Sequence, residues 1–197
     1  MEWITALMGA LGSPGAGLAV ALENLFPPVP SEVILPLAGF TAGQGGISLL
    51  AAILWTTAGS VAGALVLYGL GAWLGLDRVR RIADRLPFVS ASDVDKADAW
   101  FDRHGSTAVF AGRMVPVVRS LISVPAGVSG MPLLRFTLYT AAGSLVWNTA
   151  LILAGYALGE NWELVDRYLG WASTAVLAAL AIAIVRFAVS RLRARRS

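Results

Sequence analysis

The segment Glu23-Asn-Leu-Phe-Pro-Pro-Val-Pro-Ser-Glu32 places two carboxylates and three prolines inside an apolar stretch that runs over residues 14–46. A proline inside a helix removes a backbone hydrogen bond and clashes with the preceding turn. Pro27, Pro28 and Pro30 therefore predict a break in this stretch. Broken backbone at membrane depth is tolerated only where protein or a water-filled cavity surrounds it. We therefore predict a re-entrant helical hairpin over 14–46 rather than a full membrane span.

A second interrupted apolar stretch, residues 105–131, contains Pro116 and Pro125 together with Arg113 and Arg119, and we predict a second re-entrant hairpin there. Three uninterrupted apolar segments have the roughly 20 residues that a spanning helix needs. These predicted spans are residues 47–76, 133–158 and 171–190. The expected fold is an all-α polytopic membrane protein with a single integral membrane domain.

The composition supports this class of protein. The 197-residue chain is 57% hydrophobic and 14% charged, with a mean hydropathy of +0.71, whereas a soluble domain carries about 25% charged residues. Residues 1–77 contain no Lys or Arg. The chain has no Cys, which excludes disulfides and thiol nucleophiles. His104 is the only histidine, so we expect no His-rich metal site and no cofactor.

The basic residues predict the orientation. Six of them lie in the loop 77–104, and five lie in the last twelve positions, around the tail 191–197. By the positive-inside rule both regions are expected to be cytoplasmic, and residues 44–47 and 159–167 to face outside. Such a distribution is typical of a membrane flank rather than of a nucleic-acid-binding groove. We also predict an amphipathic helix over 92–104 with Ser92 as its N-cap, and a short interfacial helix over 2–11.

The chain shows an internal repeat. The segment Pro28-Val-Pro-Ser-Glu-Val-Ile-Leu-Pro-Leu-Ala-Gly39 is similar to Pro116-Val-Val-Arg-Ser-Leu-Ile-Ser-Val-Pro-Ala-Gly127. An apolar span with a Gly-Ser pair, Gly59-Ser60 or Gly143-Ser144, follows each one. The first hairpin is expected to open outward and the second inward, so the halves have inverted topology. Inverted repeats with broken helices are typical of secondary transporters, whose site lies between the repeats.

The two hairpins carry opposite charges: Glu23 and Glu32 in one, Arg113 and Arg119 in the other. A charge at the bilayer centre costs about 2.5–3.5 kcal/mol on insertion scales, so such residues usually face a partner or a cavity. In a continuous helix, six residues rotate the second arginine by about 600° from the first. A break at Pro116 would let both guanidinium groups surround one anion, for which the planar fork of Arg is suited.

These four charges have two interpretations. They are either permanent Glu–Arg pairs that hold the hairpins together, or a working site in which the arginines exchange partners and the carboxylates exchange protons. Burial favours the neutral form of a carboxyl group, which suits a proton-coupled carrier. Possible lining residues of a cavity are Tyr68, Ser123, Trp147 and Asn148. Asn148 and Trp147 are equally suited to helix–helix contacts, and the Gly-x-x-x-Gly motifs permit a homodimer.

These motifs resemble those of the DedA family of bacterial membrane proteins, which belongs to the VTT-domain superfamily. The resemblance covers about residues 15–160. It is carried by Glu23 to Glu32 with the following Ile34-Leu-Pro-Leu-Ala-Gly-Phe40, and by Phe110-Ala-Gly-Arg113-Met-Val-Pro116-Val-Val-Arg119 with Ser123-Val-Pro-Ala-Gly127 and Gly143-Ser-Leu-Val-Trp147-Asn148.

The resemblance implies a transporter of the bacterial plasma membrane that moves undecaprenyl phosphate between leaflets. It places the functional acids on Glu23 and Glu32 and the functional arginines on Arg113 and Arg119. We expect protons and the lipid phosphate as ligands, and a protein that is not an enzyme. The alternatives are a proton-coupled exporter of small cations or drugs, with Glu23 and Glu32 as the substrate site, and a passive phospholipid scramblase.

Overall fold

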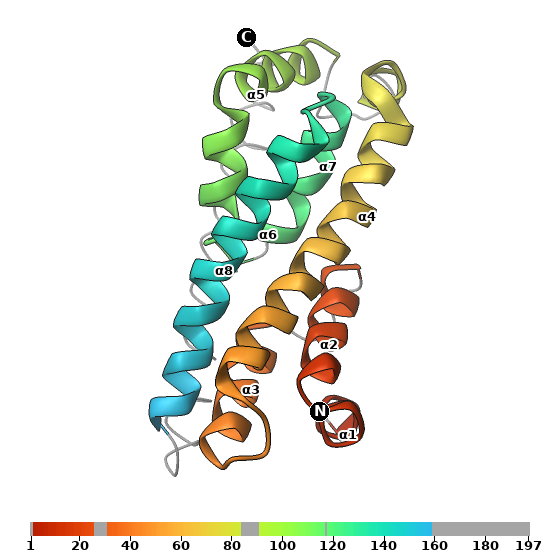
Figure 1. Cartoon of the computed structure of the whole chain (residues 1–197). Helices are drawn as coiled ribbons and strands as arrows, with labels where there is room; N and C mark the ends of the chain where they lie inside the picture. The colour runs from red at the N-terminus through yellow and green to blue at the C-terminus, as the bar shows by residue number, and fades with distance from the viewer. Residues whose placement is uncertain (1, 26–30, 84–90, 117, 159–197) are drawn as a thin grey trace, which may run out of the picture.

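The computed structural model describes residues 2–25, 31–83, 91–116 and 118–158, and every element within these ranges is a helix. Two long helices, α4 (Leu49–Ala83) and α8 (Leu133–Leu158), run side by side along the molecule (Figure 1). Three helices lie beside their lower half in this view: α1 (Glu2–Leu11), α2 (Ser13–Leu25) and α3 (Ser31–Gly43). Three others lie beside the upper half: α5 (Ala91–Gly112), α6 (Val118–Leu121) and α7 (Ser123–Val128). The all-α prediction is confirmed for the described residues.

Among the described helices, α4 and α8 have the length and apolar composition needed to cross a membrane. They contain the predicted spans 47–76 and 133–158 almost entirely. The helix α4 is kinked at Gly75, whose φ of 66° and ψ of 161° lie outside the helical region, a conformation that glycine adopts without a steric penalty. The third predicted span at 171–190, the loop 159–167 and the basic tail 191–197 lie outside the described residues.

The predicted amphipathic helix over 92–104 exists, but it is longer than expected. The helix α5 begins at Ala91 and continues through Gly105 to Gly112, because no proline interrupts this stretch. Ser92 is therefore the second residue of the helix rather than its N-cap. The boundary that we placed between the cytoplasmic loop 77–104 and the hairpin 105–131 falls in the middle of a continuous helix.

Of the two prolines predicted to break the stretch 105–131, Pro116 interrupts the helical backbone and Pro125 does not. Pro116 lies in the non-helical segment between α5 and α6. Pro125 lies in the first turn of α7, and its missing N–H leaves the carbonyl of Leu121 without a helical donor. The chain nevertheless stays helical between α6 and α7, where Ile122 has φ −59° and ψ −21°. Pro36 is accommodated inside α3. Pro27, Pro28 and Pro30 lie outside the described residues.

Glycines let the helix pairs approach closely. The helix α3 packs on α8, where Gly39 contacts the carbonyl of Ile152 and Gly155 contacts that of Pro36. The helix α7 packs on α4 in a similar way, with Gly127 against the carbonyl of Tyr68 and Gly71 against that of Val124. A Cβ at any of these four glycines would collide with the neighbouring backbone.

The Gly-x-x-x-Gly motifs also pack within the chain. Gly59 contacts the backbone of Gly17, and Gly63 contacts Asn24, so both bring α4 against α2. Gly71 and Gly155 are used in the contacts just described. Of the three motifs, Gly59–Gly63, Gly71–Gly75 and Gly155–Gly159, four glycines thus pack on other helices of the same chain. A Cβ added at Gly75 would have no atom within 4 Å, and Gly159 lies outside the described residues. The homodimer stays a prediction.

Candidate functional site

The four ionisable residues predicted for the site are all buried. The exposed fraction is 6% for Glu23, 8% for Glu32, 2% for Arg113 and 4% for Arg119. Each charge is expensive to bury without a partner. The low exposure also means that the site is closed to solvent in this conformation.

Arg119 and Glu23 form an ion pair between the two hairpin regions. Glu23 lies in the last turn of α2, and Arg119 lies in the short helix α6. The Arg119 Nη2 atom donates to the Glu23 Oε2 atom at 2.5 Å. The pairing of opposite charges predicted across the hairpins is therefore present for these two residues.

Arg113 lies beside this pair, in the turn that follows α5. Its Nη2 atom donates to the hydroxyl oxygen of Ser123 at 2.8 Å, and its Nε atom is buried without a hydrogen-bond partner among the described residues. Arg113 is within electrostatic range of both Arg119 and Glu23. The non-helical segment at Pro116 lies between the two arginines in the chain, and Arg119 pairs with the carboxylate of Glu23. That both guanidinium groups surround one anion stays a prediction.

Glu32 is placed differently. It lies in the first turn of α3 and is buried, but within the described part of the chain it forms no hydrogen bond or ion pair. The structure therefore brings three of the four predicted residues into one cluster and leaves Glu32 outside its bonding network.

A chain of polar side chains beside the arginines was missed by the sequence analysis. The Asn24 side chain donates to the Ser60 carbonyl at 3.2 Å and accepts from the Ser120 hydroxyl at 2.8 Å. The Asn148 amide donates to the Ser60 hydroxyl at 3.1 Å. The network joins α2, α4, α6 and α8. Asn24 was detectable as a polar residue adjacent to Glu23, and Ser60 as part of the repeated Gly-Ser pair, whereas Ser120 carries no distinctive signal.

The suggested lining residues have different surroundings. Ser123 and Asn148 are fully buried and belong to the polar cluster. Trp147 is half-buried, and its indole N–H has no partner among the described residues. Tyr68 has a packing role: its hydroxyl donates to the Met131 carbonyl at 2.5 Å, and its ring stacks on Phe136.

His104 is exposed on α5, where its Nδ1 atom hydrogen-bonds the Trp100 carbonyl at 3.1 Å. The described residues contain no group of three or more His, Cys, Asp or Glu side chains that is able to hold a metal ion. The buried cluster itself contains an ion pair and side-chain hydrogen bonds. A buried guanidinium with an unused N–H is suited to binding an oxyanion.

Two long apolar helices beside a buried, charged polar cluster are typical of a helical membrane protein. The family model of the VTT domain matches residues 29–157. The chain therefore belongs to the VTT-domain family, which contains the DedA proteins, and the resemblance inferred from the sequence motifs is confirmed.

Curated relatives cover most of the chain. An "Alkaline phosphatase-like protein" of Lactococcus lactis subsp. cremoris is 39% identical over 93% of this chain and 88% of the relative. The "Undecaprenyl phosphate transporter A" of Staphylococcus aureus is 33% identical over 94% of this chain and 93% of the relative. An "Uncharacterized membrane protein YkoX" of Bacillus subtilis is 36% identical over 90% of this chain and 80% of the relative. No solved structure matches the chain.

Proposed function

We propose that this protein moves a lipid phosphate, undecaprenyl phosphate or a close analogue, across the bacterial plasma membrane. The observation that carries the proposal is the buried Arg119–Glu23 pair with Arg113 beside it. Of these two arginines, only Arg119 is in ion-pair contact with a carboxylate among the described residues, which leaves Arg113 with capacity for a second anion. The name of the Staphylococcus aureus relative supports undecaprenyl phosphate as that anion.

In the proposed mechanism the phosphate group replaces Glu23 as the partner of Arg119. Arg113 contributes its unused Nε–H, and Ser123 holds the other side of that guanidinium in place. Bidentate Arg–phosphate hydrogen bonds are strong and directional, so phosphate is able to compete with a carboxylate for the same donors. Phosphate binding then separates Glu23 from its counter-ion.

Proton coupling follows from this exchange. A carboxylate that loses its arginine partner in a low-dielectric site takes up a proton rather than remain charged. Glu23 is the proposed proton carrier linked to phosphate binding. Glu32, buried without an ion pair among the described residues, is the proposed second carrier.

We also propose that α2–α3 and α5–α7 belong to two re-entrant hairpins of inverted topology. Reciprocal packing supports this arrangement: Gly39 and Gly155 bring α3 onto α8, as Gly127 and Gly71 bring α7 onto α4. In each case the second arm of one half packs on the long helix of the other half. In a transporter with inverted repeats, such crossed contacts place the substrate site between the halves. The loop 77–104 and the basic tail would then lie in the cytoplasm.

The test is a transport assay in vesicles that contain the purified protein and undecaprenyl phosphate. The amount of lipid accessible in the outer leaflet is measured over time, with and without a pH gradient. We expect protein-dependent movement of the lipid that Arg113→Ala abolishes and that Lys96→Ala, which removes an exposed charge on α5, leaves unchanged.

The same assay distinguishes the other functions. Movement of phosphatidylcholine at the same rate as undecaprenyl phosphate, without dependence on either arginine, would indicate a passive scramblase. Proton-driven movement of an organic cation in the absence of lipid movement would indicate an exporter. Release of inorganic phosphate from the lipid would indicate a phosphatase.

A further inference from the structure

Two cavities meet at the end of the molecule where α5 passes the start of α8. The first has a volume of about 300 Å³ and a polar lining that includes Arg103, His104, Ser106, Thr107 and Arg135. The second is an apolar groove of about 580 Å³ lined by residues such as Leu76, Val79, Trp100, Ile122 and Val128. Phe101 and Ser129 line both cavities. The polar cavity and the apolar groove are therefore neighbours with a common wall.

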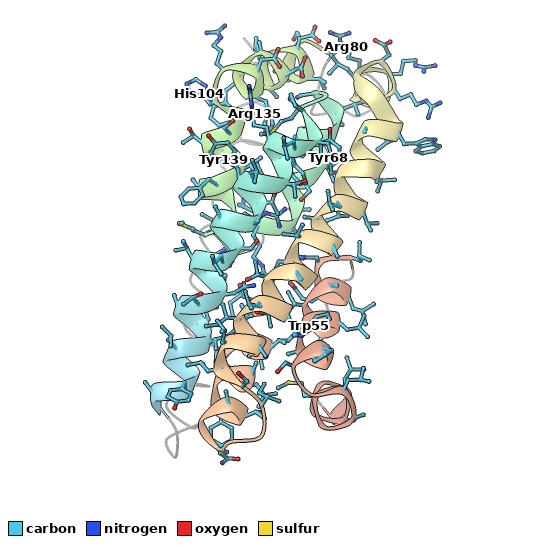
Figure 2. The ribbon with its side chains drawn as sticks, in the orientation of Figure 1. Trp55, Tyr68, Arg80, His104, Arg135 and Tyr139 are labelled. Atoms are coloured by element: carbon cyan, nitrogen blue, oxygen red, sulfur yellow. The ribbon has the colours of Figure 1, made fainter. Side chains whose placement is uncertain are left out.

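Both cavities are lined by α5, the polar cavity by residues 101–107 and the groove by residues between 94 and 101. His104 lines the polar cavity, Trp100 lines the groove, and their rings stack with centroids 5.1 Å apart. Figure 2 shows His104 on α5 and Arg135 on α8 close to each other at the upper end of the molecule. A polar cavity and an apolar groove therefore lie next to each other along α5.

The positive charges of the polar cavity are available to a ligand. The ion pairs of the described residues are Arg80–Asp77, Arg80–Asp95 and Arg119–Glu23. They include neither Arg103 nor Arg135, although Asp102 also lines this cavity. Two exposed guanidinium groups from different helices thus face one polar cavity without a carboxylate in contact among the described residues.

The groove has the opposite character. Its lining is almost entirely apolar, and its acidic residue, Asp98, has a buried carboxylate oxygen without a partner among the described residues. A phosphate in the groove would meet this carboxylate and no arginine. The charges therefore orient an amphipathic anion with its head group in the polar cavity and its hydrocarbon in the groove.

We propose that these two cavities form a binding site for a lipid phosphate, separate from the buried cluster at Arg113 and Arg119. Arg103 and Arg135 bind the phosphate group, and the groove holds the first part of the hydrocarbon chain. A soluble anion would not use the groove, and a neutral lipid would not use the arginines. The existence of this site does not depend on the proposed function, but its role does. In a transporter of lipid phosphate, the site would load or release the lipid on the side of the membrane where α5 begins.

The test uses the absence of native cysteines. Ser129→Cys places a single thiol where the two cavities meet, and its rate of labelling by a water-soluble maleimide is measured in detergent. Undecaprenyl phosphate is expected to slow labelling at lower concentration than undecaprenol or inorganic phosphate does. Arg103→Ala and Arg135→Ala, each made in the Ser129→Cys protein, are expected to raise the half-protecting concentration of undecaprenyl phosphate about ten-fold. Lys96→Ala is the control on the same helix.

Several results would overturn the proposal. Equal protection by undecaprenol and undecaprenyl phosphate would show that the arginines do not recognise a phosphate. Unchanged protection in both arginine variants would have the same meaning. A thiol that is unreactive without added lipid would show that another part of the chain fills the site. Labelling requires no transport, so a failure of the proposed transport function would leave protection intact, whereas normal transport without protection would reject this site alone.

Discussion

Arg119 donates to Glu23 at 2.5 Å across 96 residues of sequence, and both side chains are buried. The pair joins α6 of one half of the chain to α2 of the other. Desolvation of two ions offsets much of their attraction, so a buried pair stabilises a fold weakly compared with an apolar pair of the same volume. Its presence is therefore better explained by a site that exchanges partners than by stability alone.

Removing one partner of this pair should cost more than removing both. Glu23→Gln leaves Arg119 charged and buried, and we expect the free energy of unfolding to fall by about 3–5 kcal/mol. The double variant Glu23→Gln/Arg119→Gln should be less destabilised than Glu23→Gln alone. Thermal unfolding in detergent measures both. Arg80→Gln, which removes exposed ion pairs, is the control and should cost less than about 1 kcal/mol.

A lipid phosphate should rescue the Glu23→Gln variant. If phosphate and Glu23 compete for Arg119, removal of the carboxylate leaves an arginine that binds the lipid more tightly. Undecaprenyl phosphate should therefore raise the Tm of Glu23→Gln by more than it raises that of the wild-type protein. Arg113→Ala and Arg119→Ala, each made in the Glu23→Gln protein, should remove this excess over the wild-type shift, whereas lipid bound at Arg103 and Arg135 would still contribute a shift in every variant. Lys at position 113 or 119 should restore the excess only in part, because Lys lacks the bidentate fork. An equal shift in the wild-type and Glu23→Gln proteins would show that the carboxylate and the phosphate bind independently.

The close helix contacts predict a contrast between two glycines of α4. Gly71→Ala would drive a Cβ into the backbone of Val124, and we expect it to destabilise the protein by about 1–3 kcal/mol. A Cβ added at Gly69 would have no atom within 4 Å, so Gly69→Ala should be neutral or stabilising by up to about 1 kcal/mol. The two variants add the same methyl group at positions two residues apart. Similar Tm values for both would show that α7 does not pack on α4 at Gly71.

Labelling of introduced cysteines tests the inverted arrangement. Gln44 and Lys96 are exposed and lie beyond α3 and in the first half of α5, respectively. Because α4 separates them, Gln44→Cys should react with an impermeant maleimide from outside and Lys96→Cys only from the cytoplasmic side. Reaction of both from the same side would contradict the proposed topology.

The sequence predicted the helical fold and the burial of four charged residues, Glu23, Glu32, Arg113 and Arg119, because charged residues are conspicuous in an apolar chain. It also indicated that Pro116 would interrupt the chain between the arginines. It did not identify which acid pairs with which arginine, since that choice depends on how α2 packs against α6. The continuation of α5 beyond His104 was missed because its polar face ends there, whereas the backbone hydrogen bonds continue. The Asn24–Ser60–Asn148 network was missed because each of its hydrogen bonds depends on tertiary contact.

The last prediction concerns proton coupling through Glu32. Glu32 is buried in the first turn of α3, and it lacks an ion pair within the described ranges. Glu32→Gln keeps the size and hydrogen-bonding capacity of a protonated carboxyl group, so it should cost less stability than Glu23→Gln, which orphans an arginine.

If Glu32 carries a proton during transport, its replacement by Gln should leave binding of undecaprenyl phosphate within about two-fold of the wild type, since no arginine changes its partner. The rate of lipid movement in vesicles should depend on pH less steeply than in the wild type, because Glu32 can no longer release a proton while Glu23 still can. Glu32→Asp is the matched control and should retain a pH-dependent rate. A wild-type pH profile in Glu32→Gln would mean that Glu32 is structural. Proton coupling would then have to rest on Glu23 alone. The pH profile of folded, lipid-bound Glu23→Gln protein would test that role.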